Sequence, residues 1–249
     1  KFIEIILQSY LNTTDDDINS PLLLGEENLM AAATAIITAI NNNQKAKIIV
    51  DSDCDGYTSS AILLNYLYEL FPSWIENNVE WILHNGKEHG LNDMPLAEWL
   101  QEEIKLVICP DSSSEDYDEH KFLKDHGITT IVLDHHEAKM ISPNAIVINN
   151  QLSDYPNKDF SGAGIVWQFC RFLDSKLNVK NADTQLDLVA LGVDADMMSL
   201  KSKETKHIIN KGFEDQYLKN PFVAGIAWKN SFLLGQKITP IGAAFYIAP

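Results

Sequence analysis

The chain of 249 residues has a hydrophobic fraction of 45% and a formal net charge of −16 at pH 7. The length allows one large domain or two small ones, and the apolar content excludes wholesale disorder. The acidic balance, concentrated in residues 1–196, excludes a protein that coats nucleic acid through bulk positive charge, but it suits an enzyme that binds divalent cations. Arg171 is the only arginine, so phosphate binding would depend on metals, lysine, histidine or backbone N–H groups.

Short β-branched runs alternate with amphipathic segments through the first 150 residues. The runs predict strands over 47–50, 79–83, 106–109, 129–133 and 145–148. The amphipathic segments predict helices over 26–40, 58–71, 96–103 and 116–126. This alternation indicates an α/β fold, a five-stranded parallel sheet with helices on both faces. Such a sheet places ligands at the carboxyl ends of its strands.

After residue 150 the pattern changes to helices without intervening strands. Helical spacing covers 164–177, 185–195 and 204–218, and an apolar stretch follows at 237–249. We therefore predict an α/β domain over residues 1–150 and a mostly helical C-terminal extension over 151–249. The extension is expected to complete the active site.

The cysteines and the hydropathy pattern indicate the compartment. Cys54, Cys109 and Cys170 are far apart and form no CxxC pair, so neither a disulfide framework nor a thiolate zinc site is expected. No apolar run approaches the roughly 18 residues of a membrane span. The sequence thus predicts a protein of the reducing cytoplasm without membrane association.

Three acids follow the first predicted strand. Asp51, Asp53 and Asp55 alternate with other residues before Gly56, which permits a turn that would let them converge. An EF-hand calcium loop starts in the same way, but it needs a glutamate at its twelfth position, where Ile62 stands here. A simple capping and turn cluster is the remaining alternative.

Further acids and histidines follow other predicted elements. Asp111 follows the third strand within Pro-Asp-Ser-Ser-Ser, a pattern that is also typical of a helix cap, and Asp134, His135 and His136 follow the fourth. Asp194 and Asp196 end an apolar helix, where the helix dipole disfavours acids. Carboxylate and imidazole ligands suit Mn²⁺ or Mg²⁺, with Fe or Zn as alternatives. Their number favours two ions about 3.5–4 Å apart, an arrangement used for phosphoryl chemistry.

These motifs, in this order, resemble those of the DHH phosphoesterase superfamily: DSDCDG at 51–56, PDSSS at 110–114, DHH at 134–136 and LGVDADMMSL at 191–200. Within it the chain is most similar to RecJ-type single-strand-specific exonucleases, over roughly residues 27–249. Three positions depart from the RecJ pattern. Ser112 and Ser113 replace a Cys-Gly pair, Asn150 replaces a proline, and Asp194 replaces an apolar residue.

The resemblance implies two sets of metal ligands that share a bridging aspartate. One set is Asp51, Asp53 and Asp111, and the other is Asp55, Asp111, His135 and Asp196. Some relatives have a metal-binding histidine near the first position, and Asp51 would take its place. The implied catalytic residues are Asp55, Asp111, His135 and His136. His136 would also contact the scissile phosphate, while Asp134 fixes the imidazole orientation. Asp194 is expected to be a solvated acid rather than a further ligand.

Two accessory segments are candidate substrate contacts. Ser161, Gly162 and Gly164 open a helix whose N–H groups suit a phosphate, although close helix packing explains the small residues equally well. His84 and His89 follow the second predicted strand and are expected to line the cleft. We predict a substrate role for His89, with an ordinary loop histidine as the alternative.

The activity implied by the resemblance is a two-metal exonuclease that degrades single-stranded DNA from the 5′ end to mononucleotides. The alternatives are a phosphodiesterase for short oligonucleotides or cyclic dinucleotides, a pyrophosphatase or polyphosphatase, and an inactive DHH module that binds a partner. Expected partners are single-stranded DNA, short oligonucleotides, and replication or repair proteins. RecJ proteins continue into a second, clamping domain, which is expected beyond residue 249.

Overall fold

The computed structural model describes residues 13–84, 89–214, 219–229 and 243. Five strands form one sheet: β1 (Lys45–Val50), β2 (Val79–Leu83), β3 (Ile104–Pro110), β4 (Thr129–Asp134) and β5 (Ile146–Asn149). Their order is β2-β1-β3-β4-β5 and every neighbouring pair is parallel. The predicted five-stranded parallel sheet is therefore confirmed.

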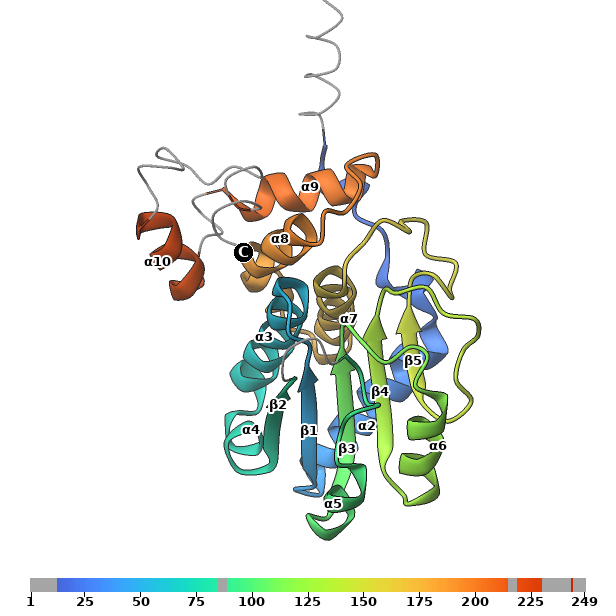
Figure 1. The fold of residues 1–249 in the computed structure, drawn as a ribbon. Coiled ribbons are helices and arrows are strands. Elements are labelled where there is room, and N and C mark those ends of the chain that lie inside the picture. The colour runs from blue at the N-terminus through green and yellow to red at the C-terminus, as the bar shows by residue number, and fades with distance from the viewer. Residues whose placement is uncertain (1–12, 85–88, 215–218, 230–242, 244–249) are drawn as a thin grey trace, which may run out of the picture.

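Successive residues of the central strands enter two different hydrophobic clusters, because side chains alternate between the faces of a strand. Ile48 packs with α2 (Glu26–Asn41), α3 (Cys54–Leu70) and α7 (Gly162–Leu177). The neighbouring Ile49 packs instead with α5 (Leu96–Gln101) and α6 (Tyr117–Asp125). Helices thus cover both faces of the sheet, as predicted (Figure 1).

The chain reverses its winding direction next to β1. β2 pairs with one edge of β1, and the chain then returns to place β3 on the other edge. In an open parallel sheet, ligands bind at the carboxyl ends of the two strands that flank such a reversal. Those ends are Val50 and Pro110, and the residues that follow them are Asp51 and Asp111.

The helical part continues from α7 through the 3₁₀ turn Ala182–Gln185 to α8 (Leu186–Ala195), α9 (Lys203–Gly212) and α10 (Pro221–Lys229). α8 and α9 lie beyond the carboxyl ends of the strands (Figure 1). Glu204 anchors α9 although it is only 1% exposed. Its carboxylate accepts hydrogen bonds from the side chains of Asn157, Tyr155 and Gln168, so this buried charge is well satisfied. One hydrophobic cluster holds residues from β1 to α9, so the core is continuous across residue 150. The division at residue 150 therefore stays a proposal.

Several helix boundaries differ from the sequence-based expectation. α3 begins at Cys54, four residues before the predicted start, because Asp53 caps it by accepting a hydrogen bond from Gly56 N (2.8 Å). α4 (Pro72–Asn78), where Pro72 occupies the first turn, was not predicted. α9 ends at Gly212, and residues 215–218 of the predicted helix lie outside the described residues, as does the stretch 237–249 apart from Ala243.

Two features that bear on the compartment can be compared with the structure: the state of the cysteines and the length of the apolar helices. Cys54, Cys109 and Cys170 are free cysteines, and Cys109 and Cys170 are buried. Within the described ranges no single helix is long and apolar enough to cross a membrane. The bent pair Asp15–Leu24 and Glu26–Asn41, with 77° between its parts, meets the length and composition criteria only jointly.

Candidate metal centre

The acids after β1 are held by the turn into α3. Asp51 follows the strand directly and is 5% exposed, and Asp53 is the capping residue of α3. Asp55 lies in the first turn of α3, where the helix dipole favours a negative charge, and is 2% exposed. The capping alternative is therefore correct for Asp53, and the turn also directs Asp51 and Asp55 towards the reversal in the sheet.

Asp55 is bound by the start of α7. Ser161 Oγ donates to it (2.9 Å), and so do the backbone N–H groups of Gly162 (2.7 Å) and Ala163 (3.1 Å). These are N–H groups that lack partners within their own helix. Ser161 and Gly162, which were predicted to hold a substrate phosphate, thus engage a protein carboxylate here. Gly164 packs against the ring of Phe160, which supports the close-packing alternative.

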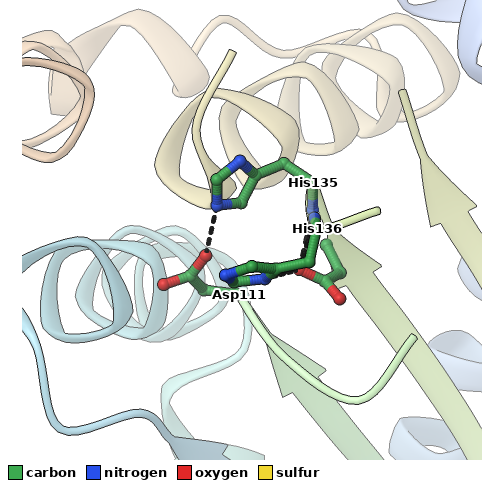
Figure 2. Close-up of side chains that lie close together, drawn as sticks. Asp111, His135 and His136 are labelled. Carbon is green, nitrogen blue, oxygen red and sulfur yellow. Dashed lines mark hydrogen bonds and ion pairs between the residues drawn. The ribbon is translucent and has the colours of Figure 1, made fainter. Parts of the chain in front are cut away.

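Asp111 occupies the centre of the site. It follows β3 in a left-handed conformation (φ 61°), which is strained for a residue other than glycine, and its N–H donates a hydrogen bond to Leu133 O (2.8 Å). Its side chain is 1% exposed. Figure 2 shows the ring of His135 directed at this carboxylate, with Nε2 of His135 3.2 Å from Oδ1.

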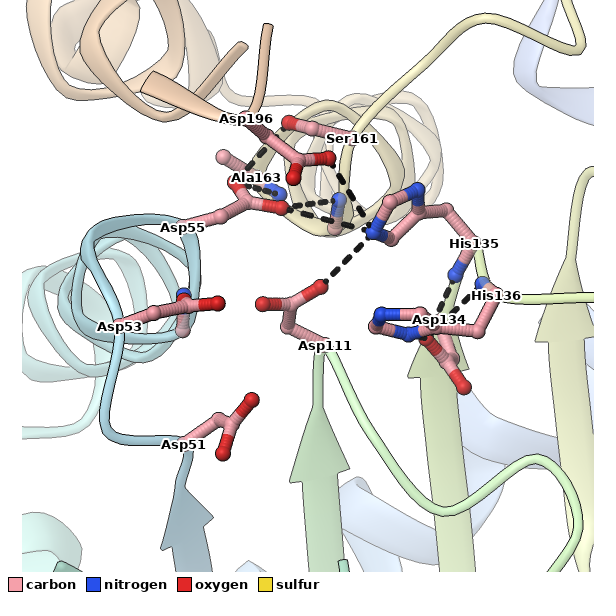
Figure 3. A network of polar contacts seen from close by, with 12 residues as sticks. Asp51, Asp53, Asp55, Asp111, Asp134, His135, His136, Ser161, Ala163 and Asp196 are labelled. Atoms are coloured by element: carbon pink, nitrogen blue, oxygen red, sulfur yellow. Dashed lines mark hydrogen bonds and ion pairs between the residues drawn. The ribbon is translucent and has the colours of Figure 1, made fainter. Parts of the chain in front are cut away.

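Nε2 of His135 faces three carboxylates at once. Besides Asp111, it lies 3.5 Å from Asp196 Oδ2 and 3.8 Å from Asp55 Oδ2. These acids come from the end of β3, the end of α8 and the start of α3, so distant parts of the chain converge here (Figure 3). Burial lowers the pKa of His135, which keeps the imidazole neutral, as a metal ligand must be.

The surroundings of these carboxylates disfavour their charged forms. Burial, followed by the negative charges of Asp55 and Asp134, raises the pKa of Asp111 well above its usual range. Burial and the charges of Asp55 and Asp53 raise the pKa of Asp196 to about 7. Within the described part of the chain, Asp111 Oδ1 and Asp196 Oδ2 are buried without a hydrogen-bond partner. A bound cation would satisfy these oxygens, so the residues fit a metal.

Three groups of described side chains have the spacing of metal ligands, with ligand atoms within 4.8 Å of one another. They are Asp51, Asp53 and Asp111; Asp55, His135 and Asp196; and Asp111, Asp134, His135 and His136. Oxygen and imidazole donors suit Mn²⁺ or Mg²⁺. The first predicted set coincides with one of these groups, whereas the second is divided, because Asp111 groups with Asp134, His135 and His136 and not with Asp55 and Asp196. The assignment of individual ligands remains a proposal. Asp194 is partly buried and belongs to none of these groups.

His136 is held by Asp134 rather than by the acids around Asp111. Asp134 accepts hydrogen bonds from the N–H groups of Ser114 (3.1 Å) and His135 (2.7 Å). Its Oδ1 also lies 2.7 Å from Nδ1 of His136, and this bond raises the pKa of His136 to about 9. His136 is thus positively charged at neutral pH, and its side chain is 47% exposed. The expected orienting role of Asp134 agrees with these bonds.

His89 lies beside His136 at the edge of the site. The two rings are 5.1 Å apart at 82°, an edge-to-face contact, and Nδ1 of His89 is 2.7 Å from Asp51 Oδ2. The sequence placed His89 in the cleft but gave no sign of the pairing with Asp51. His84, the other histidine of this segment, is buried at 3% exposure.

Sequence reasoning missed two residues that support the histidines. Nδ2 of Asn149 donates to the backbone oxygen of His136 (2.9 Å) and to Ser114 Oγ (2.8 Å). Asp116 accepts from Leu91 N (2.7 Å), next to the turn that carries His89. The position of Asn149 at the end of a predicted strand could have marked it as a candidate site residue, whereas the sequence around Asp116 is typical of an ordinary helix cap.

The model of the DHH family, N-terminal domain, matches residues 45–193. This chain belongs to the DHH family. The matched residues include every strand of the sheet, all the acids between Asp51 and Asp134, and both histidines of the DHH triplet.

Curated relatives with this DHH region are longer proteins. A Bacillus subtilis strain 168 protein, provisionally named SPbeta prophage-derived single-strand DNA-specific exonuclease YorK, is 37% identical over 223 residues, covering 89% of this chain and 37% of that protein. The single-stranded-DNA-specific exonuclease RecJ of Haemophilus influenzae is 31% identical over 183 residues, covering 68% of this chain and 31% of RecJ. The chain thus spans well under half the length of these relatives.

Solved structures share the DHH fold. RecJ from Thermus thermophilus in complex with Mn²⁺ has a TM-score of 0.73 and 24% identity, covering 89% of this chain and 32% of RecJ. A structure of exonuclease RecJ bound to manganese has a TM-score of 0.75 and 23% identity, covering 89% of this chain and 55% of that chain. At these identities the likeness establishes the fold.

Proposed function

We propose that this DHH protein is a metal-dependent phosphodiesterase that degrades single-stranded DNA from the 5′ end and releases mononucleotides. The observation that carries the proposal is the convergence of Asp55, Asp111 and Asp196 on Nε2 of His135, with the charged His136 beside them. The names of the YorK and RecJ relatives support the choice of single-stranded DNA.

Two divalent ions, Mn²⁺ or Mg²⁺, would be held by the two ligand sets that share Asp111. RecJ structures contain Mn²⁺ or Mg²⁺, which supports this choice. When bound, such ions neutralise phosphate charge and lower the pKa of a coordinated water.

The residues of the chain have separate tasks in this reaction. The charged ring of His136 would donate a hydrogen bond to a phosphate oxygen and stabilise the charge that develops there. Asp134 holds the ring in position through its bond to Nδ1, and Asn149 fixes the backbone of His136 from β5. Asp55 is held in place by the start of α7. The catalytic geometry thus depends on contacts between four separate segments.

The experiment is a product analysis with Mn²⁺ on single strands labelled at either end. The proposal predicts mononucleotides from the 5′ end, complete loss of activity in EDTA, and recovery with Mn²⁺ more than with Ca²⁺, which favours longer and looser coordination. His135→Ala serves as the inactive control. Preferential cleavage of dinucleotides, cyclic dinucleotides or pyrophosphate would show that single-stranded DNA is not the preferred substrate. Full activity in excess chelator would contradict the metal mechanism.

The proposed setting follows from the proposed reaction. A nuclease for single strands would act with replication or repair proteins, and the three free cysteines suit the reducing cytoplasm. Affinity purification from cells treated with a DNA-damaging agent tests the partners.

A further inference from the structure

The site contains two aspartate–histidine pairs of the same kind. In each, Nδ1 of the histidine lies 2.7 Å from a carboxylate oxygen: Asp134 for His136 and Asp51 for His89. Both carboxylates are almost fully buried, and both histidine side chains are 47% exposed. A buried carboxylate at Nδ1 fixes the orientation of an imidazole and leaves Nε2 to interact with something else.

The two rings are close enough to act on one group. Their centroids are 5.1 Å apart and the planes are inclined by 82°. A phosphate group has several oxygens, each of which accepts hydrogen bonds of about 2.7–3.2 Å. The edge-to-face contact places the two rings side by side at the edge of the site, so one phosphate bound there would lie near both.

His89 is followed by a firmly anchored turn, which distinguishes it from an ordinary loop histidine. Asp116 accepts from Leu91 N (2.7 Å) and from Asn92 Nδ2 (2.9 Å), and the Leu91 side chain is fully buried. Gly90 has φ +71°, and a Cβ at this position would lie 2.4 Å from Asp116 Oδ2. The backbone beside His89 is thus fixed by a close contact that only glycine permits.

Asp51 is engaged by the protein through both of its oxygens. Oδ2 lies 2.7 Å from His89 Nδ1, and Oδ1 accepts from Ser52 N (3.0 Å). The ligand group that contains Asp51 also contains Asp53, which is exposed, whereas the groups around His135 are more buried. Of these two hydrogen bonds of Asp51, the one with His89 is the shorter and joins two side chains.

The chain has no arginine with which to bind this phosphate. Arg171 donates to Asn19 O (3.2 Å) and Gln168 Oε1 (2.9 Å), and its guanidinium stacks on Trp167. These contacts engage the guanidinium of Arg171 with other parts of the protein. His89 and His136 lie at the edge of the site, where a phosphate bound near Asp111 would be within their reach.

We propose that His89 binds the substrate phosphate together with His136, and that Asp51 acts as the positioning residue of His89. The inference rests on the proposed phosphodiesterase function and identifies how this chain holds the phosphate group. Asp51 and His89 then act together, so that the loss on removing both is smaller than the sum of the two single losses, although Asp51 is also a proposed Mn²⁺ ligand.

The test is a double-mutant cycle with His89→Ala, Asp51→Asn and the double variant. Thymidine 5′-monophosphate is titrated into the Mn²⁺-loaded protein by calorimetry, Mn²⁺ is titrated into the metal-free protein, and KM and kcat are measured on a short oligothymidylate. His89→Gln, whose amide reaches the position of Nε2, is the conservative variant. His126→Ala is the matched control, because His126 is an exposed histidine at the end of α6 that contacts Phe122 O.

A hydrogen bond to a charged group predicts about tenfold weaker nucleotide binding and a similarly raised KM for His89→Ala. At saturating Mn²⁺, Asp51→Asn should show several-fold weakening, the double variant should lose less than the sum of the two single losses, and His89→Gln should recover part of the loss. Mn²⁺ affinity and stoichiometry should stay unchanged in His89→Ala and His89→Gln, whereas Asp51→Asn also removes a proposed Mn²⁺ ligand and should weaken Mn²⁺ binding. Additive losses, unchanged nucleotide binding in His89→Ala, or loss of Mn²⁺ binding in His89→Ala would overturn the proposal. If the wild type binds the nucleotide in this pattern but cleaves no phosphodiester, only the proposed function fails.

Discussion

Replacing Asp196 with asparagine should stabilise the metal-free protein at neutral and alkaline pH. Burial, and then the charges of Asp55 and Asp53, raise the pKa of Asp196 from 3.8 to about 7 in the folded protein. One pKa unit corresponds to about 1.36 kcal/mol, so the charged form costs at most about 4 kcal/mol of folding free energy. The side chain is 30% exposed. Solvent screening therefore reduces the expected gain to about 2 kcal/mol.

The sign of the effect depends on pH. A carboxyl group whose pKa is higher in the folded than in the unfolded state binds more protons when folded, so the free energy of unfolding falls as pH rises between the two values. For Asp196 this window runs from pH 3.8 to about 7. The wild type and Asp196→Asn should thus be equally stable near the lower limit. The difference between their free energies of unfolding should reach its full size above the upper limit.

Denaturant unfolding in EDTA across this pH range measures this difference. Asp154→Asn is the control, because Asp154 is an exposed loop acid, and it should change stability little at any pH. Saturating Mn²⁺ should reverse the order, since a lost ligand weakens the metal binding that stabilises the folded state. If Asp196→Asn were no more stable than the wild type above pH 7 without metal, the acids would not be under electrostatic strain.

Three further changes test single contacts. Gly162→Ala would place a Cβ 2.3 Å from Asp111 Oδ1. Thermal unfolding should show that the protein loses about 1–3 kcal/mol of stability, and turnover should fall roughly 100-fold. Unchanged kinetics would mean that Asp111 can move away from the new methyl group without cost. Asp134→Asn should lower the pKa of His136 from about 9 towards 6.5, as followed by NMR titration of the ring, and an unmoved titration would contradict the pairing. Asp111→Ala should lower turnover by several orders of magnitude while the metal-free fold persists by circular dichroism; near-normal turnover in saturating Mn²⁺ would make Asp111 a structural residue only.

The sequence by itself determined the sheet and the places where chemistry could occur. Strands that are buried on both faces, such as β3 and β4, read as continuous apolar runs, and this pattern is local. Acids directly after such runs must lie at one edge of a parallel sheet, which predicted the convergence of Asp51, Asp111 and Asp134. The early start of α3 was missed because the same acids serve as cap and as candidate ligand.

Only the tertiary structure decided how these residues are paired. His89 lies beside Asp51, and Asp55 lies against the start of α7, because the packing of α3 and α7 and the turn at Gly90 bring distant segments together. The raised pKa of Asp196 likewise depends on burial and on charges from α3, neither of which has a signature along the chain. Residue types and their order are written in the sequence, whereas hydrogen-bond partners and charge environment arise from contacts between segments far apart in it.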